Sequence, residues 1–367
     1  MPSANILIVE DDDDMFEAYA DSLGDLELGN LEINLTREKA ADSAVSSLLS
    51  GKFDGAIIDL NLDQTTPMEA GGNKVLKEIL KRHRFPVIVV SGNLQNLDPT
   101  IREHKSEFLK FMNRETANSD IFNHLIKIYQ TGITNILGGK GLIEQQLGEI
   151  FWNHLSSNIH DFPTDGEASG KILLRYIASH LSEYLDIPDT ENDYYHEAEF
   201  YIKPPIRKHI STGDIVKEGD LRYLVLSPAC DVAVRDAGQE DIKINSNKIL
   251  LSPIIDIEKS VFIQHSIIKA NSNSRERTAV LSDIIKGKRE KYGFLPKYGS
   301  MNPAVVDFQN IRTVDLAEFL NFERIATVAA MFMKDIQSRF ASYLARQGQP
   351  DLDKQKLLDE YKVLLAD

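Results

Sequence analysis

Apolar and polar residues follow two alternating patterns over the first 130 residues of the chain. Short apolar runs, typical of strands, are separated by stretches in which apolar residues recur every three or four positions, as in helices. Strands that alternate with helices favour a parallel sheet covered on both faces. The expected strands lie near residues 5–9, 31–35, 56–58, 86–90 and 108–112, and the expected helices near 15–23, 39–49, 75–80 and 121–129.

Three of these apolar runs end in an acidic or hydroxyl residue. The first run leads into Glu10 and Asp11, the third into Asp59, and the fourth into Ser91. Because the carboxyl ends of central strands converge on one crevice of an open parallel sheet, these side chains should meet. Such a group suits a hard, oxygen-preferring cation beside a phosphoryl group. Taken singly, the acidic run 10–14 would also suit a helix cap, so the prediction depends on the recurrence.

The motifs resemble those of the response-regulator receiver domain, the phosphoacceptor half of a two-component relay. The similarity covers residues 4 to about 130 and is carried by ILIVEDD at 6–12, FDGAIIDLNL at 53–62 and PVIVVSG at 86–92. It implies that a partner histidine kinase phosphorylates Asp59 and that Ser91 bonds a phosphoryl oxygen. The implied magnesium ligands are Glu10, Asp11, the Asp59 carboxylate and the Asn61 carbonyl, where the cation would relieve the repulsion between carboxylates.

The chain departs from the receiver pattern in two places. Receivers usually carry a lysine at the end of the fifth strand, three residues after an aromatic and just before a proline. Here Lys110 stands one position early and no proline follows, and Phe108 or Phe111 is the expected aromatic. The loop at 63–72 is also longer than usual, with Asp63 where the family often has proline. Lys110 is the implied catalytic cation, and a receiver fold kept as a docking surface is the alternative.

A helical region is expected after the receiver. Residues 130–140, with Gly132, Gly138 and Gly139, are typical of a hinge. Two amphipathic stretches at 141–159 and 171–185, separated by a polar turn at 161–170, predict a helical hairpin. The hairpin would either pack on its own domain or carry the state of the receiver onward.

From Tyr195 the pattern changes to short strands split by Gly, Pro and Asp turns, which predicts a small antiparallel barrel. The hairpin at 213–227 is loosely similar to the small-barrel toxin ribonucleases. The expected strands are 198–202, 213–216, 223–227, 248–255, 261–265 and 304–308, followed by helices at 316–322, 325–345 and 354–365. The predicted architecture is a doubly wound α/β receiver over 1–130, a helical linker over 131–190, and a β-rich α+β output domain with C-terminal helices over 191–367.

Composition narrows the class of protein. The net charge of −15 argues against a general nucleic-acid coat, since duplex affinity depends on neutralising phosphates. The sequence contains neither an apolar run of membrane-span length nor a secretory signal. The single cysteine, Cys230, fits a reducing compartment such as the cytoplasm. Because the neighbouring Asp231 would not lower the pKa of a thiol, a buried structural cysteine is expected.

One segment of the second half is locally basic. Residues 269–297 hold eight basic and three acidic residues, a balance of +5, and aromatic residues follow closely. Basic residues beside aromatics can bind single-stranded nucleic acid, an arm of this kind could contact the acidic receiver, and a solvated helix would look the same. Nucleic-acid binding is not the favoured interpretation.

Two functional classes follow. In the first, the receiver accepts phosphate from a histidine kinase and switches an output or adaptor module that binds another protein, with a homodimer as a further option. In the second, residues 131–367 form a regulated effector enzyme, most plausibly a nuclease. The first is favoured because no catalytic set of residues stands out in the second half. The chain also has a general similarity to receiver-associated proteins of bacterial gene clusters, some linked to phage defence.

Overall fold

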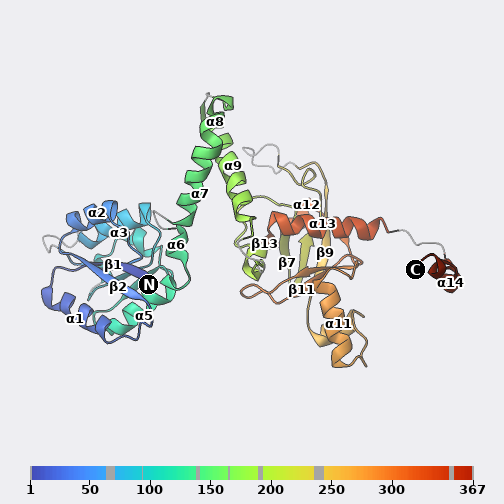
Figure 1. Ribbon diagram of the computed structural model, residues 1–367, viewed down its shortest axis with the longest axis horizontal. Coiled ribbons are helices and arrows are strands. Elements are labelled where there is room, and N and C mark those ends of the chain that lie inside the picture. Colours follow the sequence, from blue (N-terminus) through green and yellow to red (C-terminus); the bar gives the residue numbers. More distant parts are fainter. Residues whose placement is uncertain are drawn as a thin grey trace. The chain divides into compact units, whose positions relative to one another are not determined.

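The computed structural model describes residues 2–62, 71–92, 94–137, 141–163, 166–188, 193–234, 244–346 and 351–365. The chain divides into two compact units, Met1–Glu191 and Asn192–Asp367 (Figure 1). Each unit has buried apolar clusters of its own. Within the described ranges, no helix has both the length and the apolar character needed to cross a bilayer.

The first unit contains a five-stranded parallel sheet with the strand order β2-β1-β3-β4-β5. This is the doubly wound order of flavodoxin-like folds, in which β1, β3 and β4 are central. The predicted five-stranded parallel domain is therefore confirmed. Its strands are β1 (Ser3–Val9), β2 (Glu32–Glu38), β3 (Gly55–Asp59), β4 (Val87–Val90) and β5 (Leu109–Met112). Its helices are α1 (Asp13–Gly24), α2 (Ala41–Ser50), α3 (Gly71–Arg82), the short α4 (Pro99–Arg102) and α5 (Asn118–Tyr129).

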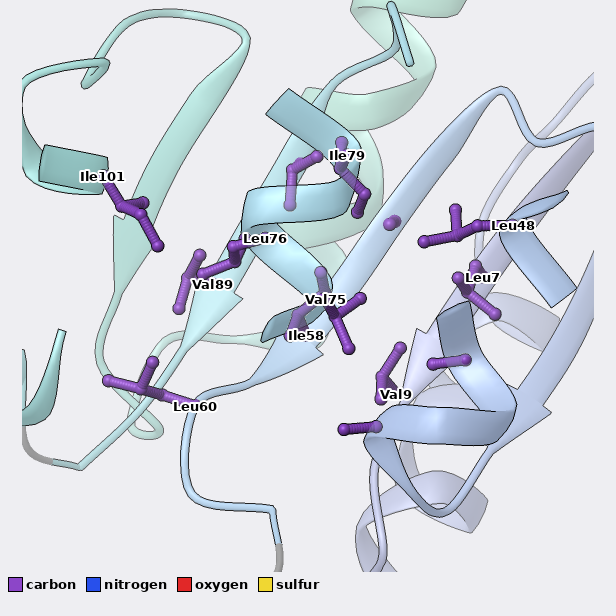
Figure 2. Packing of buried hydrophobic residues seen from close by; sticks show 14 of the residues in the cluster. Leu7, Val9, Leu48, Ile58, Leu60, Val75, Leu76, Ile79, Val89 and Ile101 are labelled. Atoms are coloured by element: carbon purple, nitrogen blue, oxygen red, sulfur yellow. The ribbon is translucent and has the colours of Figure 1, made fainter. Parts of the chain in front are cut away.

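Alternate residues of the central strands pack on opposite faces of this sheet. Figure 2 shows one face, where Ile58 and Val89 lie in the same cluster as Leu76 of α3. On the other face, Tyr19 of α1 meets Phe122 of α5 edge to face, with ring centroids 6.3 Å apart. Because both faces are covered, the central strands are continuously apolar. This packing fixes where the strands end, and so where the polar residues after them lie.

A helical region follows α5. The short helix α6 (Ile133–Leu137) lies inside the expected hinge and comes directly after Gly132, which has a φ of 78°; Gly138 and Gly139 fall outside the described residues. Helix α7 packs against α9, and the His154 ring lies 2.9 Å from the Tyr184 hydroxyl. Helix α9 begins five residues earlier than predicted, so the polar turn is shorter. The elements are α7 (Leu142–Ile150), a π-helical turn (Phe151–Leu155), α8 (Ser156–Asn158), a 3-10 turn (Ile159–Asp161) and α9 (Gly166–Leu185).

The second unit is an α+β domain, as predicted. Its main sheet has the order β10-β11-β9-β8-β7-β13-β6, with β12 paired to β9, and all its described pairs are antiparallel. The strands are β6 (Tyr201–Ile202), β7 (Asp214–Glu218), β8 (Leu221–Val225), β9 (Lys248–Asp256), β10 (Tyr292–Leu295), β11 (Ala304–Asp307), β12 (Arg312–Asp315) and β13 (Glu323–Val328). The helices are α10 (Lys259–Gln264), α11 (Ser274–Ile285), α12 (Leu316–Phe319), α13 (Ala330–Leu344) and α14 (Lys354–Lys362).

The sheet of the second unit curls so that its two end strands approach. Tyr201 belongs to β6 at one end, and its buried hydroxyl donates a hydrogen bond of 2.7 Å to the carbonyl of Pro296, just after β10 at the other end. The Tyr201 ring also stacks on Tyr298, with centroids 5.9 Å apart. The curl encloses a core that includes Leu224, Val306 and other residues of the inner face.

Three local predictions in the second unit are wrong. Residues 261–264 of the predicted strand 261–265 belong to helix α10, since a short apolar run fits either structure. The segment 198–202 is mostly a 3-10 helix (Glu197–Phe200), because the ring of His196 accepts the Ala198 amide and caps it. The predicted helix 325–345 is strand β13 followed by α13, and neither Gly nor Pro marks the junction. Strands β10 and β12 were not predicted.

Candidate functional site

Three carboxylates meet at the carboxyl edge of the parallel sheet. Val9 of β1 pairs with Ile58 of β3, so the residues that follow these positions leave the sheet at the same level. Glu10, Asp11 and Asp59 each offer a carboxylate oxygen, and these oxygens all lie within 4.8 Å of one another. Glu10 and Asp59 are each 3% exposed. The structure thus brings together the three acidic residues that the sequence placed here, in a group that could hold a metal ion.

Burial makes this cluster electrostatically costly. It raises the pKa of Glu10 from its usual 4.5 to about 7, an effect opposed by the hydrogen bond from the Asp12 amide and increased by the charge of Asp59. Burial also raises the pKa of Asp59, against the opposing effects of the Asn61 amide and of Arg114. The cluster therefore favours a cation that stabilises both carboxylates in their charged form.

The cation that contacts the Asp59 carboxylate is Arg114, which was not predicted from the sequence. Its Nη2 lies 2.5 Å from Oδ2 of Asp59, and the arginine side chain is 41% exposed. Arg114 comes two residues after the end of β5. The Ser91 amide donates a hydrogen bond of 3.2 Å to the Met112 carbonyl, which brings the start of this loop level with the site. A basic residue just beyond the fifth strand is the signal that could have identified it.

The structure does not bring Lys110 to the site. The β4–β5 ladder pairs Lys110 with Ile88, three residues before Ser91, so Lys110 lies in the interior of the strand rather than at its end. Its Nζ lies 2.9 Å from Glu107 and 3.3 Å from Nδ1 of His124. The lysine is therefore three ladder positions short of the level of Ser91. Of the two expected aromatics, Phe111 packs against the core and Phe108 is half exposed.

Polar side chains link Asp59 to the loop after β4. The Asn61 amide donates to Oδ1 of Asp59 at 3.2 Å, and Nδ2 of Asn61 lies 3.4 Å from the buried Ser91 hydroxyl. Oδ1 of Asn61 in turn lies 3.4 Å from Nδ2 of Asn96, and Asn96 is held through its carbonyl by Asn73 of α3. Ser91 and Asn61 are thus beside Asp59, as expected. The expected loop residue Asp63 lies outside the described residues.

Gly72→Ala is expected to destabilise the first unit by about 1–3 kcal/mol. An added Cβ would lie 2.6 Å from the Asp59 carbonyl oxygen and 2.7 Å from Cα of Leu60, so α3 would have to move away from the end of β3. The control is Gly148→Ala in α7, where the methyl group meets no described atom within 4 Å and should stabilise the helix by up to about 1 kcal/mol. Urea unfolding would compare them; equal effects would contradict the prediction.

The candidate residues of the second unit do not gather. Cys230 is exposed, which corrects the expectation of a buried cysteine; its Sγ lies 3.5 Å from Asp231. The basic segment 269–297 is not one continuous arm, because it contains α11 and the core strand β10. Arg289 lies 3.5 Å from Asp283. Binding of this segment to nucleic acid or to the acidic receiver stays a prediction.

The chain matches no family model and no curated protein. Three solved structures similar to its N-terminal part are receiver domains. One, from Methylobacillus flagellatus, is 19% identical, with 33% of this chain and 98% of that chain covered and a TM-score of 0.27. A second is the N-terminal domain of a three-domain response regulator from Carboxydothermus hydrogenoformans. It is 16% identical, with 35% of this chain and 98% of that chain covered and a TM-score of 0.28. The third belongs to a sensor histidine kinase of Pseudomonas aeruginosa and holds magnesium in its active-site cleft. It is 19% identical, with 34% of this chain and 96% of that chain covered and a TM-score of 0.26.

The first 130 residues have the fold of a response-regulator receiver domain. The sheet order β2-β1-β3-β4-β5 is the order of that fold. The carboxylate group at the ends of β1 and β3 lies where open α/β sheets bind their ligands. The second unit, Asn192–Asp367, is a separate α+β domain.

Proposed function

We propose that the chain is a response-regulator-like signalling protein that accepts a phosphoryl group on Asp59. The observation that supports it is the group formed by Glu10, Asp11 and Asp59 at the carboxyl edge of the sheet. Asp59 is the member at the end of a central strand, with its carboxylate hydrogen-bonded on both oxygens. A carboxylate held in this way is oriented for attack on an incoming phosphorus atom.

The proposed reaction transfers the phosphoryl group from a histidine of a partner kinase. A carboxylate oxygen of Asp59 forms the new bond to phosphorus, the phosphorus–nitrogen bond breaks, and the histidine leaves with the electron pair and takes up a proton. Ser91, buried and beside Asn61, would donate its hydroxyl to a phosphoryl oxygen. The product is an acyl phosphate on Asp59.

Glu10, Asp11, Asp59 and the Asn61 carbonyl are the proposed ligands of a magnesium ion. The residues fit, because the ion prefers carboxylate and carbonyl oxygens and three such carboxylates lie within reach of one position. Bound there, magnesium would neutralise charge between the acceptor and the phosphoryl oxygens. Glu10 and Asp11 would then hold the ion in place, and Asp59 would stay accessible to the phosphodonor while it reacts.

The experiment uses the full chain, a small phosphodonor and intact-mass measurement. With magnesium, one phosphoryl group should be added, and hydroxylamine should remove it because an acyl phosphate is labile to that reagent. Without a divalent cation, addition should be strongly reduced. A chain that stays unmodified with magnesium and phosphodonor, and that does not bind beryllium fluoride, would overturn the proposal.

The affinity for magnesium should fall as the pH drops below about 7. Glu10 has a pKa of about 7 and must lose its proton to bind the ion, so protons compete with the metal. We expect the association constant to drop by about tenfold per pH unit below 7 and to level off above it. Calorimetric titration with magnesium at pH values from about 5.5 to about 8.5 measures this pH dependence. In Glu10→Gln the slope should flatten; an unchanged slope would assign the proton to another group.

We also propose that the second unit is an output or adaptor module for another protein. The observation that supports this role is that the second unit is a domain with its own core, separate from the unit that contains Asp59. A nuclease-like effector is the alternative, and an association with phage defence stays a prediction. Incubating the full chain with RNA and DNA in the presence of metal ions tests the choice. Cleavage lost on substitution of one second-unit residue would favour the effector.

A further inference from the structure

The acceptor carboxylate already has a positive partner. Nη2 of Arg114 donates a charge-assisted hydrogen bond to Oδ2 of Asp59, with the two atoms 2.5 Å apart. The other carboxylate oxygen, Oδ1, accepts the Asn61 amide at 3.2 Å. In the described part of the chain, Arg114 is the only Lys or Arg that forms an ion pair with Asp59. The unphosphorylated site is therefore neutralised in part by a side chain from the loop after β5.

Arg114 is long enough, and has enough N–H donors, to contact a negative charge placed further from the strand than the Asp59 carboxylate. A guanidinium carries five N–H donors, and the arginine side chain is 41% exposed, so it does not lie in a sealed pocket. It extends past Gly92, the residue after Ser91, where an added Cβ would lie 4.0 Å from Cδ of Arg114. The arginine, from the loop after β5, thus passes close to the loop after β4 that begins with Ser91.

Phosphorylation would move the negative charge away from the carboxylate. In the acyl phosphate the Asp59 carboxyl is an uncharged ester-like group, and about two negative charges lie on the phosphoryl oxygens. A guanidinium binds phosphate oxygens in a fork geometry that matches its own. The favourable position for Arg114 then lies two bonds further out than the contact it makes with Oδ2.

We propose that Arg114 is the phosphoryl-oxygen ligand of this receiver and that it exchanges the Asp59 carboxylate for the phosphoryl group on modification. This inference rests on the proposed function of Asp59. It also assigns a direction to the signal, because α5 begins at Asn118, only four residues after Arg114. Movement of the arginine would pull on the connection between β5 and α5. Lys110, held by Glu107 and His124, has no part in this exchange.

The proposal requires opposite effects on two ligands. Without phosphate, Arg114 places a positive charge beside the proposed magnesium ligands, so Arg114→Gln should bind magnesium more tightly, by about fivefold. At saturating magnesium, the same variant should bind beryllium fluoride, a phosphoryl mimic, at least about tenfold more weakly, because a charge-assisted hydrogen bond is lost. An arginine with only a structural role would weaken both or neither.

Calorimetric titration of the full chain measures both affinities in wild type, Arg114→Gln, Arg114→Lys and the control Lys110→Gln. We expect Arg114→Lys to recover part of the beryllium fluoride affinity and Lys110→Gln to match wild type. If wild type binds beryllium fluoride and Arg114→Gln binds it equally well, the role of Arg114 is wrong while Asp59 stands. If Lys110→Gln is the weak variant, the lysine is the ligand. If wild type itself does not bind, the proposed function fails first.

Discussion

Asp59→Asn is expected to abolish phosphorylation of the full chain, because an amide cannot supply the carboxylate oxygen that attacks phosphorus. Asp59 is the carboxylate of the cluster that ends a central strand, and its environment holds it against both Asn61 and Arg114. Intact mass after incubation with magnesium and a small phosphodonor measures the effect. The expected signal is one added phosphoryl group in wild type and none in the variant.

The matched control is Asp54→Asn, at the opposite end of the same strand. Asp54 precedes β3 and accepts the backbone amide of Asn5 at 2.9 Å, far from the carboxyl edge in the register of the sheet. It should be phosphorylated like wild type. Undiminished addition in Asp59→Asn would move the acceptor elsewhere, and peptide mapping of the labelled chain would then identify it.

The carboxylates of the site could be predicted because each follows a continuously apolar strand. Residues 56–58 are typical of a strand buried on both faces, so the first polar residue after them, Asp59, must lie where the chain leaves the core. The parallel topology then brings Glu10 to the same edge, since Val9 pairs with Ile58. Local pattern and strand order together were sufficient for these residues.

Arg114 could not be predicted in the same way. It lies in a loop, 55 residues from its partner Asp59, and its reach depends on where β5 ends. The predicted strand end at residue 112 agrees with the end of β5, but the resemblance to receivers directed the prediction to Lys110, which lies in the interior of the strand. The cation beside Asp59 therefore comes from the loop beyond a correctly placed strand, where the local pattern does not show which side chain reaches the site.

The architecture of the second unit depends on contacts that are distant in the sequence. The curl of its sheet is fixed by the hydrogen bond between Tyr201 and Pro296, 95 residues apart. Residues 261–264 are helical although they suit a strand; Phe262 is buried in a cluster with Ile255 of β9 and Val305 of β11. Tertiary packing of this kind decides between helix and strand where local preference is weak.

The largest stability effect is expected at a buried ion pair in the second unit. Asp214, at the start of β7, is 0% exposed, and Arg324 of β13 donates to it from Nε at 2.9 Å. The carboxylate also accepts the Thr327 hydroxyl at 2.6 Å and the Ser211 amide at 2.8 Å. Asp214→Ala would leave these donors unpaired and should cost about 3–5 kcal/mol. Hydrogen exchange in peptides from β7 and β13 measures the loss, with β3 as an internal reference.

The control separates burial from charge. Lys248 and Asp315 also form an ion pair, at 2.9 Å, but both side chains are more than half exposed. Asp315→Ala should therefore cost less than about 1 kcal/mol. Equal losses in Asp315→Ala and Asp214→Ala would contradict a special role for the buried pair.

A double variant tests the physical reason for the effect. Most of the cost of Asp214→Ala should come from the positive charge of Arg324 that remains buried without its partner. Adding Arg324→Met removes that charge and keeps much of the apolar volume. The double variant is then expected to lose less stability than the sum of the two single variants, with an interaction energy of about 1–3 kcal/mol. Additive losses would mean that the two side chains stabilise β7 and β13 independently, through the Thr327 and Ser211 contacts on one side and packing on the other.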